Sequence, residues 1–262
     1  DVRRVTGEWQ RLGWEWQSSP LLRGACQLAG DVDITRTRAW EHGLVEVQDL
    51  GSQIVLESSP AAAGERWLDA CAGAGGKTLA IGACMRSTGR LYAFDTSAHR
   101  LDALKPRLAR SGLSNVHPVA IAHERDDRIK RLAGKIDRVL VDAPCSGLGT
   151  LRRNPDLKWR QNPKLVQALS VTQAAILQSA ARLLKPGGRL VYATCSLLLE
   201  ENEQIAEAFS AAHPEFTLLP AAEVLTQAGV GNAAGLCSGA YLRLWPHQHH
   251  TDGFFAAVWQ KS

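Results

Sequence analysis

The chain has 262 residues, of which 45% are hydrophobic and 21% are charged, and its formal net charge is +4. These values are typical of an ordinary soluble protein, and they exclude a membrane span because no apolar stretch approaches the roughly 20 residues that cross a bilayer. The mild positive charge favours a polyanionic partner but is too small to indicate a dedicated nucleic-acid binder.

The six cysteines form no CxxC pair and do not cluster with histidine. This spacing argues against structural zinc and against a disulfide framework, so we expect reduced thiols and no metal. The chain begins at Asp1 without an initiator methionine or an apolar leader. We therefore expect a cytoplasmic, monomeric protein, either whole or a fragment cut from a longer chain.

Two regions of the chain differ in amino-acid composition and in periodicity. Residues 1–45 are rich in tryptophan and show no clear period, and we expect them to form a small N-terminal subdomain. Residues 46–262 are expected to form the main domain, with residues 45–60 as the helix that leads into it. No internal repeat or low-complexity segment is visible.

From Glu65 onward, short β-type runs alternate with helical patterns. This order predicts an α/β fold with a mostly parallel, Rossmann-like sheet covered by helices on both faces. From Tyr241 the pattern predicts an antiparallel hairpin added at the sheet edge, for seven strands in all. The expected parallel strands are 66–70, 90–95, 116–121, 137–143 and 188–194, and the expected helices are 76–85, 99–112 and 163–184, the last stopped by KPGG at 185–188.

The stretch WLDACAGAGGKT, residues 67–78, is a strand that runs into a glycine loop and a helix start. A phosphate-binding P-loop would need glycine where Cys71 stands, and a dinucleotide fingerprint would need one at Thr78, so a P-loop ATPase is nearly excluded. A helix N-terminus still suits a ligand, and Asp95 ends the next strand, where it can accept hydrogen bonds from ribose hydroxyls. The loop therefore predicts an adenosine-containing ligand; the alternative is a structural turn with a surface Asp.

Two further motifs follow the fourth and fifth strands. VDAPCSGLG places Asp142 and Cys145 at the carboxyl edge of the sheet, and VYATCSLLLEEN places Cys195 at the same edge. Ligands of doubly wound sheets bind at this edge, so we expect two thiols beside the adenosine site.

On these residues the chain resembles the Sun-type RNA cytosine-5 methyltransferases, in particular the catalytic part of the bacterial 16S rRNA enzymes, from about Val45 to the C-terminus. The resemblance implies a class I methyltransferase fold, S-adenosylmethionine as cofactor, and RNA, specifically rRNA, as substrate. The motifs that carry it are QDLGSQ (48–53), DACAGAGGKT (69–78), DAPCSGLGTLRRNPDLKW (142–159), ATCSLLLEEN (193–202) and RLWPHQHHTDGFF (243–255).

The resemblance also implies the catalytic roles. Cys195 is expected to bond to C6 of cytosine, which makes C5 nucleophilic enough to take a methyl group, and Cys145 to assist release after a proton leaves C5. Asp142 is expected to bind the N3/N4 edge of the base and to touch the cofactor. Related DNA enzymes use the cysteine of the PC motif as nucleophile, so the assignment of the two thiols rests on resemblance and not on spacing.

The expected cofactor contacts extend from the glycine loop to the ends of the following strands. His123 stands where the family tends to place an Asp for the adenine amino group, with Asp126 or Asp127 as alternatives. Lys77 is expected to be free to face the carboxylate of the methionine-linked adenosine ligand or the RNA. The full set is Cys71, Ala72, Gly73, Ala74, Gly75, Gly76, Lys77, Asp95, Arg100, His123 and Asp142.

An RNA base must leave its stack to reach such a pocket, so a flipped or unstacked cytosine is expected. Positive charge beside an aromatic ring suits an RNA backbone groove, and Arg152, Arg153, Lys158 and Trp159 supply both. The alternative for this segment is a solvated loop with a buried Trp. Residues 1–45 are a second candidate RNA contact. The rival class of function is a non-catalytic RNA-binding or ribosome-assembly factor that keeps the methyltransferase fold.

Overall fold

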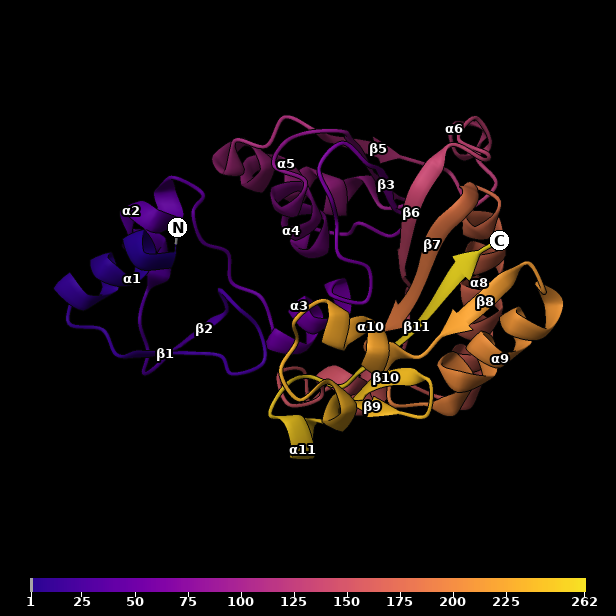
Figure 1. The fold of residues 1–262 in the computed structure, drawn as a ribbon. Helices are drawn as coiled ribbons and strands as arrows, with labels where there is room; N and C mark the ends of the chain where they lie inside the picture. Colours follow the sequence, from indigo (N-terminus) through magenta and orange to yellow (C-terminus); the bar gives the residue numbers. More distant parts are fainter. Residues whose placement is uncertain (1) are drawn as a thin grey trace.

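A nine-stranded sheet forms the centre of the computed structural model, which describes residues 2–262. Its strand order is β5-β4-β3-β6-β7-β11-β10-β9, and β8 pairs with β11 off this path (Figure 1). The strands are β3 (Arg66–Asp69), β4 (Arg90–Asp95), β5 (Val116–Ala120), β6 (Ile136–Asp142), β7 (Leu184–Thr194), β8 (Phe216–Leu219), β9 (Cys237–Ser238), β10 (Tyr241–Leu244) and β11 (Phe254–Lys261).

Strands β3 to β7 pair with one another in parallel, whereas every pair that includes β8, β9, β10 or β11 is antiparallel, the contact of β11 with β7 among them. The predicted α/β class, the mostly parallel central sheet and the C-terminal hairpin of β10 and β11 are confirmed. The main helices are α3 (Leu50–Leu56), α4 (Gly76–Cys84), α5 (Ala98–Ser111), α8 (Pro163–Ala181), α9 (Glu203–Ala212) and α10 (Ala221–Gln227), with single-turn helices α6 (Asp127–Lys130), α7 (Leu157–Arg160) and α11 (Pro246–His249). Short 3-10 helices are η2 (Leu148–Thr150), η3 (Leu199–Glu201) and η4 (Ala233–Leu236).

The side chains of the parallel strands alternate between two cores, because successive residues of a strand point to opposite faces. Trp67 of β3 and Leu140 of β6 lie in the core that includes α3, α4 and α5. Leu68 and Val141 lie in the core that includes α8 and α9. Burial on both faces explains why these strands read as continuous apolar runs.

Three predictions of detail are wrong. Residues 2–262 hold nine strands in the sheet where seven were expected, because the short strands β8 and β9 carry no period of their own. The helix expected over 45–60 begins only at α3, where Asp49 caps it by accepting from the Gly51 N–H at 2.8 Å. The KPGG segment lies within β7, as an irregularity in its pairing with β6.

Residues 2–45 form α1 (Val2–Arg11), β1 (Trp16–Ser18), β2 (Cys26–Leu28), η1 (Ile34–Arg36) and α2 (Arg38–Glu41). Strands β1 and β2 make a separate two-stranded sheet, and Val5, Trp9 and Ala39 form a small apolar cluster of their own. This segment lies to one side of the large sheet in Figure 1. A boundary at residue 45 stays a prediction.

No helix within residues 2–262 is long and apolar enough to cross a membrane. No group of three or more His, Cys, Asp or Glu side chains within those residues could hold a metal ion.

Candidate active site

A cavity of about 930 Å³ opens at the carboxyl ends of β3, β4, β6 and β7. This is the edge at which ligands of doubly wound sheets bind. The structure brings most of the predicted site residues together there: the cavity is lined by Cys71, Ala72, Gly73, Ala74, Gly76, Lys77, Asp95, Arg100, His123, Asp142, Cys145, Arg153 and Cys195.

The glycine loop after β3 is built on a buried carboxyl group. Asp69 accepts hydrogen bonds from the Thr78 hydroxyl at 2.7 Å and from the Cys71 N–H at 3.3 Å. Burial raises the pKa of Asp69 to about 7. The carboxyl group therefore ties the strand end to the first turn of α4 and fixes the loop between them.

The glycines of this loop differ in role. A Cβ added at Gly73 would meet nothing within 4 Å, so this position can admit a ligand close to the backbone. At Gly75 the φ is +86° and a Cβ would lie 2.1 Å from Leu104 Cδ1 of α5. Gly75 is also missing from the cavity wall, so the structure gives it a packing role and no cavity contact.

Asp95 closes the loop from the next strand. Its two carboxylate oxygens accept the N–H groups of Gly73 at 2.8 Å and Ser97 at 2.7 Å. Each oxygen has a second lone pair that can accept from a ligand. This geometry leaves the predicted ribose contact available.

The residues at the far end of the cavity distinguish between His123 and the alternatives Asp126 and Asp127 for the contact with the adenine amino group. His123 lines the wall, as does Glu124, which the sequence did not single out. Asp126 instead caps α6, accepting from the N–H groups of Ala122 at 3.0 Å and Arg128 at 2.9 Å. Neither Asp126 nor Asp127 lies in the wall of this cavity, so the geometry favours His123 among the three.

The two predicted thiols face each other across the cavity wall. Cys145 Sγ and Cys195 Sγ are 3.5 Å apart, within hydrogen-bond distance for sulfur. The hydrogen bond from Cys145 lowers the pKa of Cys195, and Lys77 lowers it further. The same contact with Cys195 raises the pKa of Cys145 well above its ordinary value. These directions favour the thiolate on Cys195, and either sulfur can donate the proton that the two share.

Lys77 differs from its prediction. Its ammonium group donates to Asp142 Oδ2 at 2.8 Å, and the side chain is only 11% exposed. Burial lowers the pKa of Lys77, but the Asp142 carboxylate outweighs it and raises the pKa overall. The lysine is therefore not free: it holds Asp142 in place beside the thiols.

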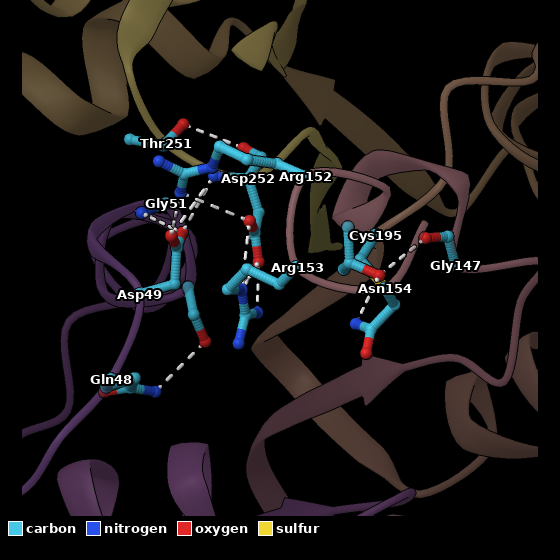
Figure 2. A network of polar contacts seen from close by, with 12 residues as sticks. Gln48, Asp49, Gly51, Gly147, Arg152, Arg153, Asn154, Cys195, Thr251 and Asp252 are labelled. Atoms are coloured by element: carbon cyan, nitrogen blue, oxygen red, sulfur yellow. Dashed lines mark hydrogen bonds and ion pairs between the residues drawn. The ribbon is translucent and has the colours of Figure 1, made fainter. Parts of the chain in front are cut away.

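The two predicted RNA-binding arginines meet two carboxylates (Figure 2). Arg153 Nε donates to Asp252 Oδ2 at 2.9 Å, and Arg152 lies 3.4 Å from Asp252 Oδ1 and 3.5 Å from Asp49 Oδ2. The backbone N–H of Asp252 in turn donates to Asp49. Both arginines are more than half exposed, while the Asp252 side chain is fully buried. The arginines thus join three motifs that lie far apart in the sequence.

The other two predicted RNA-binding residues lie at the surface on α7. Trp159 is 81% exposed, so the alternative of a buried Trp is wrong. Lys158 Nζ lies 4.9 Å from the centre of the Trp159 ring, a cation–π contact. Neither residue lines the cavity.

No role was predicted from the sequence for several polar residues that the structure buries behind the thiols. Glu201, Asp252 and Arg243 all stand in the quoted motifs, yet none was assigned a task. A sequence signal existed for Arg243 alone, which is a charged residue inside the apolar run YLRLW at 241–245, since buried charges are rare unless they are paired. Arg243 is 3% exposed and donates to the Leu197 carbonyl at 2.9 Å, in the loop after Cys195.

Comparisons with known proteins agree with this geometry. The family model of 16S rRNA methyltransferase RsmB/F matches residues 54–260. The probable ribosomal RNA small subunit methyltransferase B of Synechocystis is 38% identical over 229 residues, which cover 87% of this chain and 50% of that protein. The protein of the same name from Bacillus subtilis is 34% identical and covers 95% of this chain and 55% of its own length.

A solved structure shows the same fold over the whole chain. The methyltransferase homolog protein from Pyrococcus horikoshii superposes with a TM-score of 0.82 at 28% identity, covering 100% of this chain and 83% of that one. The chain spans about half the length of the curated relatives it matches. On the family match and these identities, the chain belongs to the 16S rRNA methyltransferase RsmB/F family.

Proposed function

We propose that this chain is an S-adenosylmethionine-dependent rRNA cytosine-5 methyltransferase that acts through a covalent bond between Cys195 and C6 of the base. The observation that carries the proposal is the pair of thiols 3.5 Å apart in the wall of a large cavity at the ligand-binding edge. The curated relatives named ribosomal RNA small subunit methyltransferase B support rRNA as the substrate.

The cofactor fits the side of the cavity formed by the glycine loop. Gly73 leaves open space beside the backbone, the first turn of α4 offers N–H groups, and Asp95 can accept from a ribose. Arg100 and His123 extend this wall toward the other end. When bound there, S-adenosylmethionine supplies an electrophilic methyl group.

The residues of the chain supply the remaining chemistry. Cys195 attacks C6 as a thiolate, and the thiol of Cys145 donates to its sulfur until the bond forms. Asp142, held by Lys77, is placed to bind the N3/N4 edge of the cytosine and to stabilise charge there. Cys145, once its own proton has passed to solvent, takes the proton from C5; the C5–H electron pair re-forms the C5–C6 double bond as the C6–S bond breaks, and Cys195 leaves as the thiolate.

The RNA is proposed to reach the cavity along α7. Trp159 offers an exposed ring for base stacking, and Lys158 adds positive charge. Arg153 lines the cavity and is more than half exposed, which suits contact with a phosphate of the flipped nucleotide.

The test uses the chain with 16S rRNA and S-adenosylmethionine. Cys195→Ala should abolish methyl transfer, whereas Cys145→Ala should accumulate a covalent protein–RNA adduct that survives denaturing electrophoresis. Cys84→Ala is the matched control, because Cys84 is exposed and lies outside the cavity. Full activity of Cys195→Ala would contradict the mechanism. If calorimetry detects no S-adenosylmethionine binding, the result favours the non-catalytic assembly factor.

A further inference from the structure

A fully buried carboxyl group lies behind the two thiols. Glu201, at the end of η3, has no exposed surface, and each of its oxygens accepts two hydrogen bonds. Oε1 accepts from the Ser146 N–H at 2.8 Å and from Gln173 Nε2 at 3.1 Å. Oε2 accepts from the hydroxyls of Ser146, at 2.5 Å, and of Ser196. Such a group is costly to bury unless it is fully paired, as it is here.

The partners of Glu201 come from both thiol loops. Ser146 directly follows Cys145, and Ser196 directly follows Cys195, so Glu201 holds the residue after each thiol. The two serine hydroxyl oxygens are 3.1 Å apart, close to the 3.5 Å that separates the two sulfurs. The Cys-Ser pairs of the two loops therefore run side by side, with the serines held together by one carboxyl group.

Other contacts fix the same two loops from outside. Gln173 of α8 also donates to the Pro144 carbonyl at 2.9 Å, just before Cys145. Asn202 donates to the Ser196 carbonyl at 3.0 Å. The chain thus holds the backbone on both sides of the thiol pair, and Glu201 is the residue that bonds to both loops through its side chain.

We propose that Glu201 is a positioning residue that sets the distance between the two sulfurs and so keeps Cys145 donating a hydrogen bond to Cys195. The inference rests on the proposed function, in which Cys195 reacts as a thiolate. Glu201 does not line the cavity, so it acts through the serines and not on the substrate.

Other groups also act on the ionisation of Cys195. Lys77 of α4 lowers its pKa, and Asp142 at the end of β6 raises it. Arg153, after η2, is close enough to Cys195 for the two charges to interact. Lys77, Asp142 and Arg153 line the cavity, whereas Glu201 does not, so its replacement leaves them in place. The negative charge of Glu201 also raises the pKa of Cys145, so losing the charge alone would lower the pKa of that thiol.

The experiment measures the apparent pKa of Cys195 from the pH dependence of iodoacetamide alkylation, with the Cys195 peptide quantified by mass spectrometry. In Glu201→Gln, an amide can no longer accept four hydrogen bonds, and the thiol loops should separate. Losing the hydrogen bond to a charged sulfur should raise the Cys195 pKa by about one unit, which slows alkylation at pH 7 about tenfold. Cys145→Ala should give a similar rise.

A double-mutant cycle tests the route of the effect. If Glu201 acts through Cys145, then Glu201→Gln should cause no further rise in the Cys145→Ala background, because the hydrogen bond is already lost. Additive rises would overturn the proposal, as would an unchanged Cys195 pKa in Glu201→Gln. Glu200→Gln is the matched control, since the Glu200 side chain is exposed, and its pKa value should equal that of the wild type.

A milder variant guards against loss of the fold. Ser196→Ala removes one donor to Glu201 and should raise the Cys195 pKa in the same direction, with the fold checked by circular dichroism. The alkylation assay uses neither RNA nor cofactor. An inactive wild-type chain would therefore contradict the proposed function while the alkylation result still decides the role of Glu201.

Discussion

The two halves of the cavity are built on different principles. On the side of β3 and β4, the wall is glycine loop and exposed side chains such as Arg100 and His123, with open space at Gly73. On the side of β6 and β7, the thiol loops rest on buried polar groups, among them Glu201 and Asp252. One half is open to a ligand, and the other is held rigid from behind.

This difference matches the tasks proposed for the two halves. A cofactor must enter and leave once per turnover, so its half needs an accessible loop. Two sulfurs that share a hydrogen bond must keep one distance, so their half needs a scaffold whose side chains have a single arrangement.

The largest expected effect concerns Asp69, the buried carboxyl group under the glycine loop in the cofactor half of the cavity. Burial raises the pKa of Asp69 from 3.8 to about 7, so the folded state keeps this proton at a pH where the unfolded chain has lost it. The contribution to stability is therefore full below pH 4 and is lost as the pH rises through 7. Relative to Asp69→Asn, the wild type should lose roughly 3 kcal/mol of unfolding free energy between pH 4 and pH 7.

Urea unfolding of both proteins at pH 4, 5.5 and 7 measures this difference. Asp31→Asn is the control, because Asp31 is exposed and its removal should leave the wild-type pH profile unchanged. Parallel profiles for the wild type and Asp69→Asn would contradict the prediction.

The scaffold of the thiol half is broken by removing a partner of Asp252. Arg153→Met leaves this fully buried carboxylate with Arg152 as its remaining cation, at 3.4 Å. Asp252 is buried but the Arg153 side chain is more than half exposed, so solvent screens part of the loss, and we expect about 2 kcal/mol of unfolding free energy. Arg160→Met is the matched control in the same segment, because its ion pair with Asp156 is exposed and should cost less than about 1 kcal/mol. Equal losses in urea titrations would refute the distinction.

Two glycines of the cofactor loop should respond differently to the same change. Gly75→Ala forces a methyl group against Leu104 and strains a positive φ, so we expect a loss of about 2 kcal/mol of unfolding free energy. Gly73→Ala has the same backbone problem but open space, so its loss should be about 1 kcal/mol. Calorimetric titration should then show weaker S-adenosylmethionine binding for Gly73→Ala, because the new methyl group stands in the cavity.

The sequence carried enough information for the layout of the sheet and its ligand edge. Apolar runs and turn residues set the limits of β3, β4 and β6 to within one residue, because these strands are buried on both faces. The thiols were placed correctly for the same reason: each follows a strand of the parallel sheet, and parallel strands end at one edge. Strand β9 was not predicted, because a strand of two residues has no period to detect.

What could not be predicted is how distant segments meet behind the site. The contact of Glu201 with Ser146 spans 55 positions, and that of Asp252 with Arg153 spans 99. Such contacts depend on the final packing and leave no local spacing in the sequence. Lys77 shows the same limit, since its pairing with Asp142 joins the first turn of α4 to the end of β6, which come together only in the folded protein.

The smallest expected effect lies outside both halves, on the proposed RNA path. Trp159 is 81% exposed, so Trp159→Ala should leave the free energy of unfolding within about 0.5 kcal/mol of the wild type. Loss of base stacking should nevertheless weaken binding of a 16S rRNA fragment by about 1 kcal/mol, and Trp159→Phe should restore most of it.

Filter binding at several salt concentrations separates the contribution of stacking from that of charge. Lys158→Ala should reduce the salt slope by about one, whereas Trp159→Ala should leave it unchanged. Unchanged affinity of Trp159→Ala would place the ring outside the interface.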